Sequence, residues 1–520
     1  MAPTLYPDAT TSSPETASDV ERLHQLGYAQ ELLRRMSGFS NFAVSFTIIS
    51  ILSGCLTLYG YGMGTGGPVV MSIGWPLVGV LVIIVGLAMA EICSAYPTAG
   101  GLYYWSAKLA GRSAPVWSWY TGWFNLLGQV AVTAGIDFGL ALFLSAEMNL
   151  LWGYNTDPKH VIAVYAVVLF LHGLLNTLGV RLVAFLNDVS VWWHILGVLV
   201  IVGALLIIPD HFFPSHHQTV GFVFGHFVNM TGWGSGVYVF LLGLLLAQYT
   251  FTGYDASAHM TEETNRAAYT APRGIVMSIV VSLFAGWVLL LGVTFAIQNY
   301  SAELGSSTGV PPAQIFIDAI GRKGGELLML IVIGAQFFCG MSSVTANSRM
   351  IYAFSRDGAM PGSAFWHRIN RRTRTPTNSI IFATVGAFIL GLPYLFNSTA
   401  YAAVTSIAVI GLYIAYVVPT FLRLRAGSNF KPGPWTLGKW SRPVGIIAVT
   451  WVVIITVLFM LPTTHPITRD NFNYTVVAVG VVLVYATLMW VLSARHWFTG
   501  PRVQGTPEEL AAIERDLASV

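Results

Sequence analysis

The stretch QYTFTGYDASAHMTEE, residues 248–263, interrupts an apolar segment in a way that an ordinary membrane helix does not tolerate. Apolar residues 232–247 lead into it, and its middle holds Thr252 and Gly253, a helix-weakening pair, followed closely by Asp255. An ionisable side chain at bilayer depth costs roughly 2.5 to 3.5 kcal/mol and is tolerated mainly inside a helix bundle or beside a water-filled cavity. The stretch therefore predicts a functional site. The alternative is that Asp255 lies near a helix end with its carboxylate at the membrane interface.

A second apolar segment, SFTIISILSGCLTLYGYGMGTGGP at residues 45–68, is interrupted in a similar way. Ser53 and Gly54 break it early, and five further glycines crowd its far end. Unwound backbone survives at membrane depth only where protein surrounds it or where it lines a cavity. Two interrupted segments in corresponding positions of two chain halves indicate the binding site of a transporter. The glycines have a second explanation, because small residues also let membrane helices pack closely.

The composition of the 520-residue chain excludes an ordinary soluble protein. Hydrophobic residues make up 55% of it and charged residues 9%, against about 25% charged residues in soluble domains. The net charge of +3 gives no reason to expect a nucleic-acid partner. The three cysteines show neither a disulfide framework nor metal-ligand spacing. We therefore expect an all-α integral membrane protein without a metal or cofactor, whose surroundings are the lipid bilayer.

The apolar pattern predicts twelve transmembrane helices. They are expected at residues 41–65, 70–95, 115–148, 160–178, 187–208, 233–260, 274–298, 326–354, 377–397, 400–422, 443–463 and 474–494. The polar residues 1–38 lack the pattern of a signal peptide and are interpreted as a cytoplasmic tail. The predicted division is a twelve-helix domain at 39–498, comprising a first repeat (39–208), a second repeat (232–425) and helices 11 and 12 (443–498), followed by a cytoplasmic tail at 499–520.

The positions of the basic residues predict the orientation. With both termini cytoplasmic, 22 of the 26 Lys and Arg residues fall on the inner side of the membrane. The outer side holds only Lys159, Arg322, Lys323 and Arg469. This is the bias expected of cytoplasmic loops, and a missed or extra span would scramble every later loop. We expect a multi-pass protein of the plasma membrane.

Five pieces of the sequence resemble one family of membrane transporters. They are SILSGCLTLYGYGMGTGGP (50–68), EICSAYPTAGGLYYWSA (91–107), TGYDASAHMTEET (252–264), APRGI (271–275) and ANSRMIYAFSRDGAMPGS (346–363). The chain is similar to amino-acid permeases of the amino acid, polyamine and organocation superfamily. It is most similar to the amino acid and choline transporter branch, which includes 4-aminobutyrate and choline permeases. The resemblance implies a five-plus-five inverted-repeat fold with helices 1 and 6 discontinuous and two helices appended.

The resemblance also implies where the substrate binds. In that family the unwound part of helix 1 holds the substrate carboxylate, and the matching residues here are Ser53, Gly54 and Cys55. Carbonyl groups at the break in helix 6 hold the amine, and the matching residues are Phe251, Thr252 and Gly253. Exposed amides at a helix N-terminus suit an anion, and terminal carbonyls suit an ammonium group. Tyr249 lies where relatives have an occluding aromatic residue; ordinary packing explains it equally well.

The coupling ion stays open at this point. Relatives that use sodium surround it with oxygens from helices 1 and 8, and Ser342, Ser343 and Thr345 are the matching hydroxyls. Some sodium-independent relatives have a protonatable residue of helix 5 there, and His194 is the titratable residue well inside the predicted helix 5. A histidine titrates near neutrality, although a lone histidine also serves as a packing residue. Asp255 is a second candidate for a substrate or proton partner.

The predicted function is secondary active transport of an amino acid or related amine by alternating access, coupled to protons or working as exchange. The amine would be 4-aminobutyrate-like, or choline or a polyamine. The alternative is a membrane channel or a receptor for small amines. An enzyme is not expected, because catalytic polar groups do not cluster beyond isolated Asp137, His172 and His259.

Overall fold

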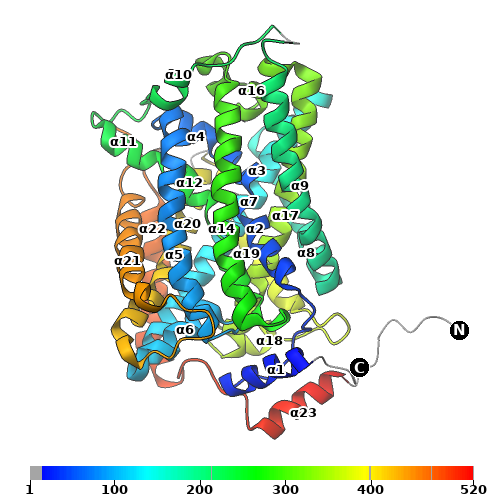
Figure 1. The fold of residues 1–520 in the computed structure, drawn as a ribbon, viewed down its shortest axis with the longest axis vertical. Coiled ribbons are helices and arrows are strands. Elements are labelled where there is room, and N and C mark those ends of the chain that lie inside the picture. The colour runs from blue at the N-terminus through cyan, green and yellow to red at the C-terminus, as the bar shows by residue number, and fades with distance from the viewer. Residues whose placement is uncertain (1–13, 212–213, 398–399, 470, 519–520) are drawn as a thin grey trace, which may run out of the picture.

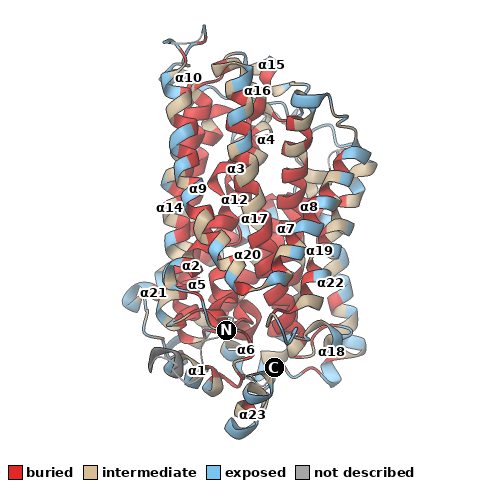
Figure 2. Cartoon of the chain, turned by 90° about the vertical axis from the view of Figure 1, so that its right-hand side faces the viewer, coloured by how far each residue is buried: buried red, intermediate tan, exposed pale blue. Residues whose placement is uncertain are grey.

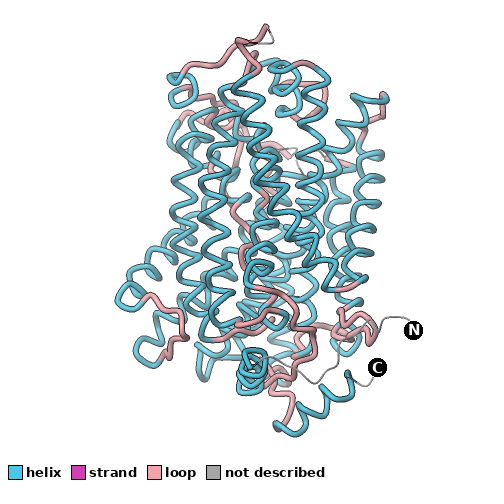
Figure 3. The backbone as a smooth tube through the Cα atoms, turned by 45° about the vertical axis from the view of Figure 1, so that its right-hand side comes forward, coloured by secondary structure: helices cyan, strands magenta, loops and turns pink. Residues whose placement is uncertain are grey.

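The chain is all-helical over residues 14–211, 214–397, 400–469 and 471–518, the part that the computed structural model describes. Helices make up most of the backbone, and loops gather mainly at the two ends of the molecule (Figure 3). Eleven helices in this part are long and apolar enough to cross a membrane. The predicted class, an all-α integral membrane protein, is confirmed.

Each of these eleven helices overlaps a predicted segment. They are α2 (Gly38–Ile49) with its continuation α3 (Ile51–Thr57), α5 (Trp75–Ala95), α7 (Ala114–Trp152), α8 (Pro158–Leu178), α9 (Val180–Ile207), α14 (Ala267–Phe295), α17 (Arg322–Arg356), α19 (Thr377–Gly391), α20 (Ala400–Ala426), α21 (Ser441–Leu458) and α22 (Thr475–Leu492). The predicted segment 233–260 instead holds a shorter apolar helix, Gly236–Thr250, formed by α11 (Gly236–Gly243) and α12 (Leu245–Thr250). The count of twelve and the division into two repeats stay predictions.

Short helices surround the bundle at both ends. The α-helices among them are α1 (Pro14–Leu26), α4 (Tyr59–Gly64), α6 (Gly101–Ala110), α10 (Val220–Gly225), α13 (Ala256–His259), α15 (Tyr300–Leu304), α16 (Pro311–Ile320), α18 (Ser363–Trp366) and α23 (Pro507–Ala518). The single π-helical and 3₁₀ turns are η1 (Val70–Gly74), η2 (Gly111–Ser113), η3 (Thr261–Glu263), η4 (Leu392–Leu395), η5 (Gly427–Asn429), η6 (Gly438–Trp440) and η7 (Ala494–His496). Figure 1 shows α1, α6, α18 and α23 at one end and α10 and α16 at the other.

The core of the bundle forms around α2, α3 and α7. In the most apolar part of Gly38–Thr57, 83% of the residues are buried, and the same share is buried in the stretch that contains α7. The corresponding share in α22 is 17%. Helix α7 packs against α20, α17, α8 and α19. Exposed residues lie along the outer faces of the bundle (Figure 2). Large apolar side chains are among the exposed ones, for example those of Phe170 and Leu199. A soluble protein rarely exposes such a wide apolar surface, so this belt is where lipid is expected.

The first and last helices lie together. His24 of α1 contacts Glu514 of α23 through Nε2 and Oε1, 2.7 Å apart, and the backbone N–H of Gln30 donates to the same carboxylate at 2.6 Å. Arg374 donates to backbone oxygens of both segments, those of Glu31 and Leu517. The N-terminal and C-terminal segments therefore form one layer across this end of the bundle (Figure 1).

Candidate functional site

The first break in the apolar helices lies at Ser50. Helix α2 ends at Ile49, Ser50 has a left-handed backbone (φ 44°, ψ 74°), and α3 begins at Ile51. A residue other than glycine adopts this conformation only where its surroundings hold it there. The Ser50 hydroxyl lies 2.8 Å from His194 Nε2 and also contacts the hydroxyl of Ser53. These two contacts hold the break open.

The break comes three residues before the predicted position at Ser53. Ser53, Gly54 and Cys55 lie inside the short helix α3, and the backbone N–H groups of Ser53 and Gly54 both donate to the Ser50 carbonyl. Gly54 has a different reason to be glycine. A Cβ there would lie 2.7 Å from Thr250 Cγ2 and 2.8 Å from the Ile49 carbonyl oxygen, so the two interrupted segments also approach each other closely at Gly54.

The second break follows α12. Phe251 to Asp255 separate α12 from α13, and Gly253 has φ +84°. A Cβ on Gly253 would lie 2.1 Å from Ile48 Cγ2, so the two breaks pack directly against each other. Tyrosines of α20 hold the unwound backbone: Tyr413 donates to the Phe251 carbonyl, and the Gly253 N–H donates to the Tyr416 hydroxyl at 3.3 Å.

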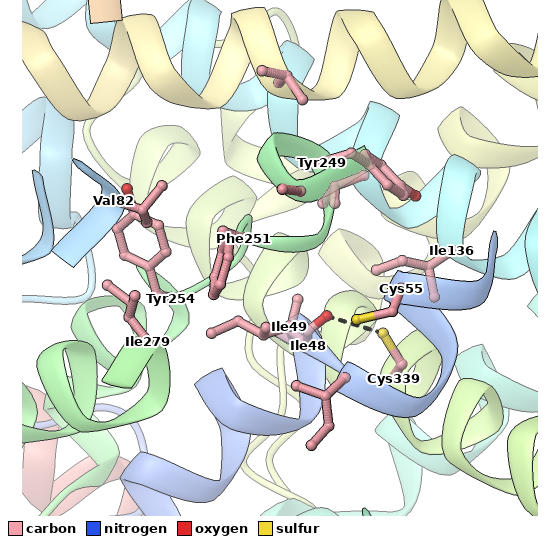
Figure 4. Packing of buried hydrophobic residues seen from close by; sticks show 14 of the residues in the cluster. Ile48, Ile49, Cys55, Val82, Ile136, Tyr249, Phe251, Tyr254, Ile279 and Cys339 are labelled. Carbon is pink, nitrogen blue, oxygen red and sulfur yellow. Dashed lines mark hydrogen bonds between the residues drawn. The ribbon is translucent and has the colours of Figure 1, made fainter. Parts of the chain in front are cut away.

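A small closed cavity lies where the two breaks meet. Its volume is about 10 Å³, room for about one water molecule. Its lining includes the predicted residues Gly54, Tyr249 and Thr252. The remaining lining residues are Ile48, Ile49, Thr57, Ile136, Thr250, Gln336 and Cys339. Figure 4 shows Tyr249, Ile136 and Cys339 approaching the end of α2 from different elements, with the Cys339 sulfur directed at the Ile48 carbonyl.

Two polar groups of this cavity are unsatisfied. The Tyr249 hydroxyl and the Gln336 carbonyl oxygen are buried, and neither has a hydrogen-bond partner among the described residues. A buried polar group without a partner costs about 1–3 kcal/mol. The cavity therefore favours a small polar ligand, and any ligand larger than water requires its walls to move apart.

A larger cavity lies between this closed cavity and the α16 end of the bundle. It has a volume of about 320 Å³, and residues of α4, α15 and α16 contribute to its walls, including Gly60, Leu304 and Pro311. Thr57 lines both cavities. The two cavities therefore adjoin at Thr57, and the wider cavity lies on the side of the α16 end.

Asp255 does not line the cavity. Its carboxylate is buried and fully engaged, accepting from Tyr416 OH at 2.7 Å and from Gln129 Nε2 at 2.8 Å. His259 Nε2 lies 3.2 Å from the same carboxylate, and its Nδ1 lies 3.0 Å from the Ala99 carbonyl. Asp255 therefore connects the second break to α7, α20 and the start of α6. The interfacial alternative does not apply to a carboxylate with these contacts.

Of the candidate coupling residues, His194 contacts the first break, and the two serines contact α9 and α7. His194 is buried in α9, with Nδ1 2.8 Å from the Ser190 carbonyl and Nε2 at Ser50. The Ser342 hydroxyl donates to Asn187 of α9, whereas the Ser343 hydroxyl contacts Thr133 of α7 at 2.8 Å. The two serine oxygens thus face different helices and do not converge on one point.

The α1 end of the bundle is closed by buried ion pairs. Glu262 and Glu263 follow the second break and pair with Arg356 and Arg349 of α17 at 3.1 and 2.8 Å. All four side chains are at most 2% exposed. The chain just before α2 completes the closure, because the backbone N–H groups of residues 35 and 36 donate to the Glu263 carbonyl.

Sequence reasoning missed the partners that lie far away along the chain. These partners belong to stretches whose local sequence does not reveal the contact. They are Gln336 and Cys339 in the cavity wall, Gln129 and Tyr416 around Asp255, and the arginines of α17. One signal in the sequence was available, namely the rarity of charged residues. A Glu or Arg next to a membrane span needs a partner of opposite charge when the rest of the bundle is uncharged. This rule directs attention to Glu262, Glu263 and Arg349.

Two interrupted helices that meet at a small cavity inside an apolar bundle are the arrangement expected of a membrane transporter. The comparisons with known proteins agree. A family profile described as "Amino acid permease" matches residues 36–484. The chain is 47% identical over 506 residues to "Amino-acid permease BAT1" of Arabidopsis thaliana, covering 94% of this chain and 97% of that protein. It is 46% identical over 498 residues to the "Amino-acid permease BAT1 homolog" of Oryza sativa subsp. japonica, covering 92% of this chain and 95% of that protein. It is 31% identical over 503 residues to the "GABA-specific permease" of Saccharomyces cerevisiae, covering 95% of this chain and 87% of that protein.

The chain belongs to the amino-acid permease family. The predictions of family, of transport and of a multi-pass membrane protein are thereby confirmed. Its relatives are permeases, so the prediction that the chain is not an enzyme is confirmed, and the channel or receptor alternative is set aside.

Proposed function

We propose that this permease carries an amino acid or a related small amine of the 4-aminobutyrate type across the plasma membrane by alternating access. The observation that carries this proposal is the closed cavity at the meeting point of the two breaks, lined by Gly54, Tyr249 and Thr252 and containing unpartnered polar groups. The similarity to a protein named for 4-aminobutyrate supports that amine over choline or a polyamine.

The cavity supports a specific orientation of the substrate. The carboxylate faces the first turn of α3, at Ser53, Gly54 and Cys55, near the positive end of that helix; the Ser53 and Gly54 amides, which donate to the Ser50 carbonyl in this closed state, would turn to the carboxylate. The amine faces the carbonyl groups of Phe251, Thr252 and Gly253. The Phe251 carbonyl already accepts from Tyr413, and its second lone pair is left for the amine. Tyr249 closes over the substrate and gains the hydrogen-bond partner that it lacks.

The wider cavity and the ion pairs support the route. Substrate enters from the α16 end through the cavity of about 320 Å³, and it leaves past Glu262 and Glu263 at the α1 end. The basic residues of the loops support placing the α1 end, with both termini, in the cytoplasm. The boundaries of the two tails and of the two repeats are part of the same proposal.

A proton is the coupling ion that the contacts favour. Ser342 and Ser343 face different helices, which does not support a shared sodium site. His194 faces the first break, and a proton on Nε2 would reverse its hydrogen bond with the Ser50 hydroxyl. We therefore expect His194→Gln to lower the response of transport to an inward proton gradient. The alternative mode is exchange of substrates without net proton movement, and the same assay measures it.

Transport into proteoliposomes tests the proposed function. Purified protein is reconstituted, and initial uptake of radiolabelled 4-aminobutyrate, neutral and basic L-amino acids, choline and spermidine is measured under imposed proton or sodium gradients. We expect saturable accumulation of an amino acid or amine that collapses with a protonophore, or counterflow against internal substrate. A sodium requirement would contradict proton coupling. Unsaturable conductance, or no uptake of any compound in the panel, would contradict the function itself.

A further inference from the structure

A buried acid and base pair lies outside the substrate cavity. Asp137 in α7 and His172 in α8 are both fully buried, with Oδ1 and Nδ1 3.0 Å apart. Gly340 of α17 packs against them: a Cβ there would lie 1.8 Å from Asp137 Oδ1 and 2.5 Å from His172 Cε1. Three helices thus meet at this pair, and α17 reaches it only because residue 340 is glycine.

The hydrogen bonding of the pair leaves a place for one proton. The Asp137 carboxylate accepts at Oδ1, so His172 Nδ1 carries a hydrogen. Asp137 Oδ2 and His172 Nε2 are buried and have no hydrogen-bond partner among the described residues. With a neutral imidazole the pair has a net charge of minus one inside an apolar bundle. One added proton, on Oδ2 or Nε2, makes the pair neutral.

Few other titratable groups act on this pair. Those within electrostatic reach of Asp137 are Tyr165 of α8, Tyr249 of α12 and Cys339 of α17. Tyrosine and cysteine side chains are ordinarily uncharged at neutral pH. Helix α19, which packs on α7 and α8, has no titratable residue between Thr377 and Gly391. No Lys or Arg in the described part of the chain forms an ion pair with Asp137, so a proton is the available counter-charge.

Both sides of the pair adjoin the substrate cavity. Ile136, next to Asp137, lines the cavity, and its carbonyl accepts from Gln336 of α17 at 2.7 Å. Cys339, next to Gly340, also lines the cavity, and its sulfur donates to the Ile48 carbonyl at the end of α2 (Figure 4). Because α7 and α17 both contribute to the cavity wall, a relative movement of these helices that opens the cavity would also change the contact of Gly340 with the pair.

We propose that Asp137 and His172 form a proton-binding site, separate from the substrate cavity, whose loading couples substrate transport to the proton gradient. The proposal rests on the proposed transport function. The proton comes from the outer solution, forms an O–H bond at Asp137 Oδ2 or an N–H bond at His172 Nε2, and leaves to the cytoplasmic solution, so no other reactant is needed. His194 at the first break is a second proton acceptor, and it differs from this pair because both of its nitrogens have partners in the uncharged form.

The test compares Asp137→Asn and His172→Gln with wild type in proteoliposomes. The readout is the ratio of initial uptake with an inward proton gradient to uptake without one, using radiolabelled 4-aminobutyrate or the compound of the panel that wild type accumulates fastest. Substrate counterflow without a gradient serves as the readout of folding and binding. We expect Asp137→Asn to lower the ratio to unity while counterflow continues, and His172→Gln to lower the ratio several-fold. Internal pyranine should show that proton entry with substrate is lost in Asp137→Asn.

The chain offers a matched control at the start of α8. Asp157 and His160 form an exposed pair, with Oδ1 and Nδ1 2.6 Å apart and side chains 43% and 46% exposed. Asp157→Asn and His160→Gln should keep the wild-type ratio. The proposal is overturned if Asp137→Asn and His172→Gln keep the wild-type ratio and proton entry, or if the exposed pair lowers the ratio equally. If the wild-type protein exchanges substrate without any proton response, the proton-site proposal is overturned but the transport function is retained. If the wild-type protein shows no transport, the proposed function itself is refuted.

Discussion

Gly253 is the residue at which the two breaks make their closest contact, and Gly253→Ala should damage substrate binding without damaging the bundle. Its backbone has φ +84°, and an added Cβ would lie 2.1 Å from Ile48 Cγ2 and 3.0 Å from Ile48 Cβ. The change adds one methyl group and no polarity. Any effect therefore comes from backbone strain and overlap.

The magnitude has two parts. An L-residue in the left-handed region costs roughly 1–2 kcal/mol. Relief of the overlap requires Ile48 Cγ2 to move from 2.1 Å to about 3.4 Å, the start of ordinary contact, and overpacking of this kind costs roughly 1–3 kcal/mol. Together they give about 2–5 kcal/mol against the closed arrangement. At 1.4 kcal/mol for each factor of ten, binding that needs this arrangement should weaken about 30-fold to a few thousand-fold.

The assay is equilibrium binding of the radiolabelled substrate to detergent-solubilised protein, with size-exclusion chromatography to verify folding. Gly203→Ala in α9 is the matched control, because a Cβ there meets nothing within 4 Å, and its affinity should equal that of wild type. The double variant Gly253→Ala with Ile48→Ala separates the two parts. Removing Cγ2 abolishes the overlap at 2.1 Å, and it leaves both the tighter-than-usual contact with Ile48 Cβ at 3.0 Å and the backbone strain.

We expect the loss of binding free energy in the double variant to be smaller than the sum of the losses in the two single variants. The difference should be roughly the 1–3 kcal/mol of the overlap. An affinity of Gly253→Ala within a factor of three of wild type would refute the reasoning. Strictly additive losses would show that the contact with Ile48 does not limit binding.

Three further changes have clear expected outcomes. Gly54→Leu adds a side chain 2.7 Å from Thr250 Cγ2, so substrate binding should be lost while the yield of monodisperse protein stays normal; retained affinity would sink this expectation. Asp255→Asn keeps the shape but removes the charge that holds Tyr416 and Gln129, so transport should fall, whereas wild-type transport across pH 5 to 8 would make Asp255 a purely structural residue. Burial raises the pKa of Glu303 in α15 to about 7, from an ordinary value of 4.5. The folded protein then holds a proton that the unfolded chain has lost, so thermal stability should decrease as the pH rises from 4.5 through 7. Glu303→Gln should flatten that decrease, and an unchanged slope in a melting experiment would disprove it.

The positions of the membrane helices were predictable because their physics is local. A span must be apolar over about 20 residues, and charges mark its ends, so each predicted segment overlaps an apolar helix of the structure. The break in segment 233–260 was also visible, since Thr252, Gly253 and Asp255 violate the pattern at one place. The helix ends of α12 and α13 lie on either side of those residues.

The position of the first break was less predictable because it depends on distant partners. The local sequence draws attention to Ser53 and Gly54, yet the backbone turns at Ser50, whose hydroxyl is held by His194 from another helix. The pair of Asp137 and His172 has the same character. Its two members are on separate helices, and nothing in either local sequence indicates that Gly340 leaves room for them to meet.

Helix α17 connects the parts on which alternating access depends. Cys339 and Gly340 on it touch the substrate cavity and the Asp137–His172 pair, and Arg349 and Arg356, further along, pair with the glutamates that follow the second break. Removing one partner of a buried ion pair costs about 3–5 kcal/mol. This free energy corresponds to a factor of at least about a hundred in an equilibrium constant. The α1 end therefore stays closed unless both partners gain water or new contacts together. We expect a shift of α17 relative to η3 to provide this, because both arginines lie on α17 and both glutamates lie on η3. Under the proposal, the same shift alters the contact of Gly340 with the buried pair, so we expect opening of the α1 end and release of the proton to occur in one movement.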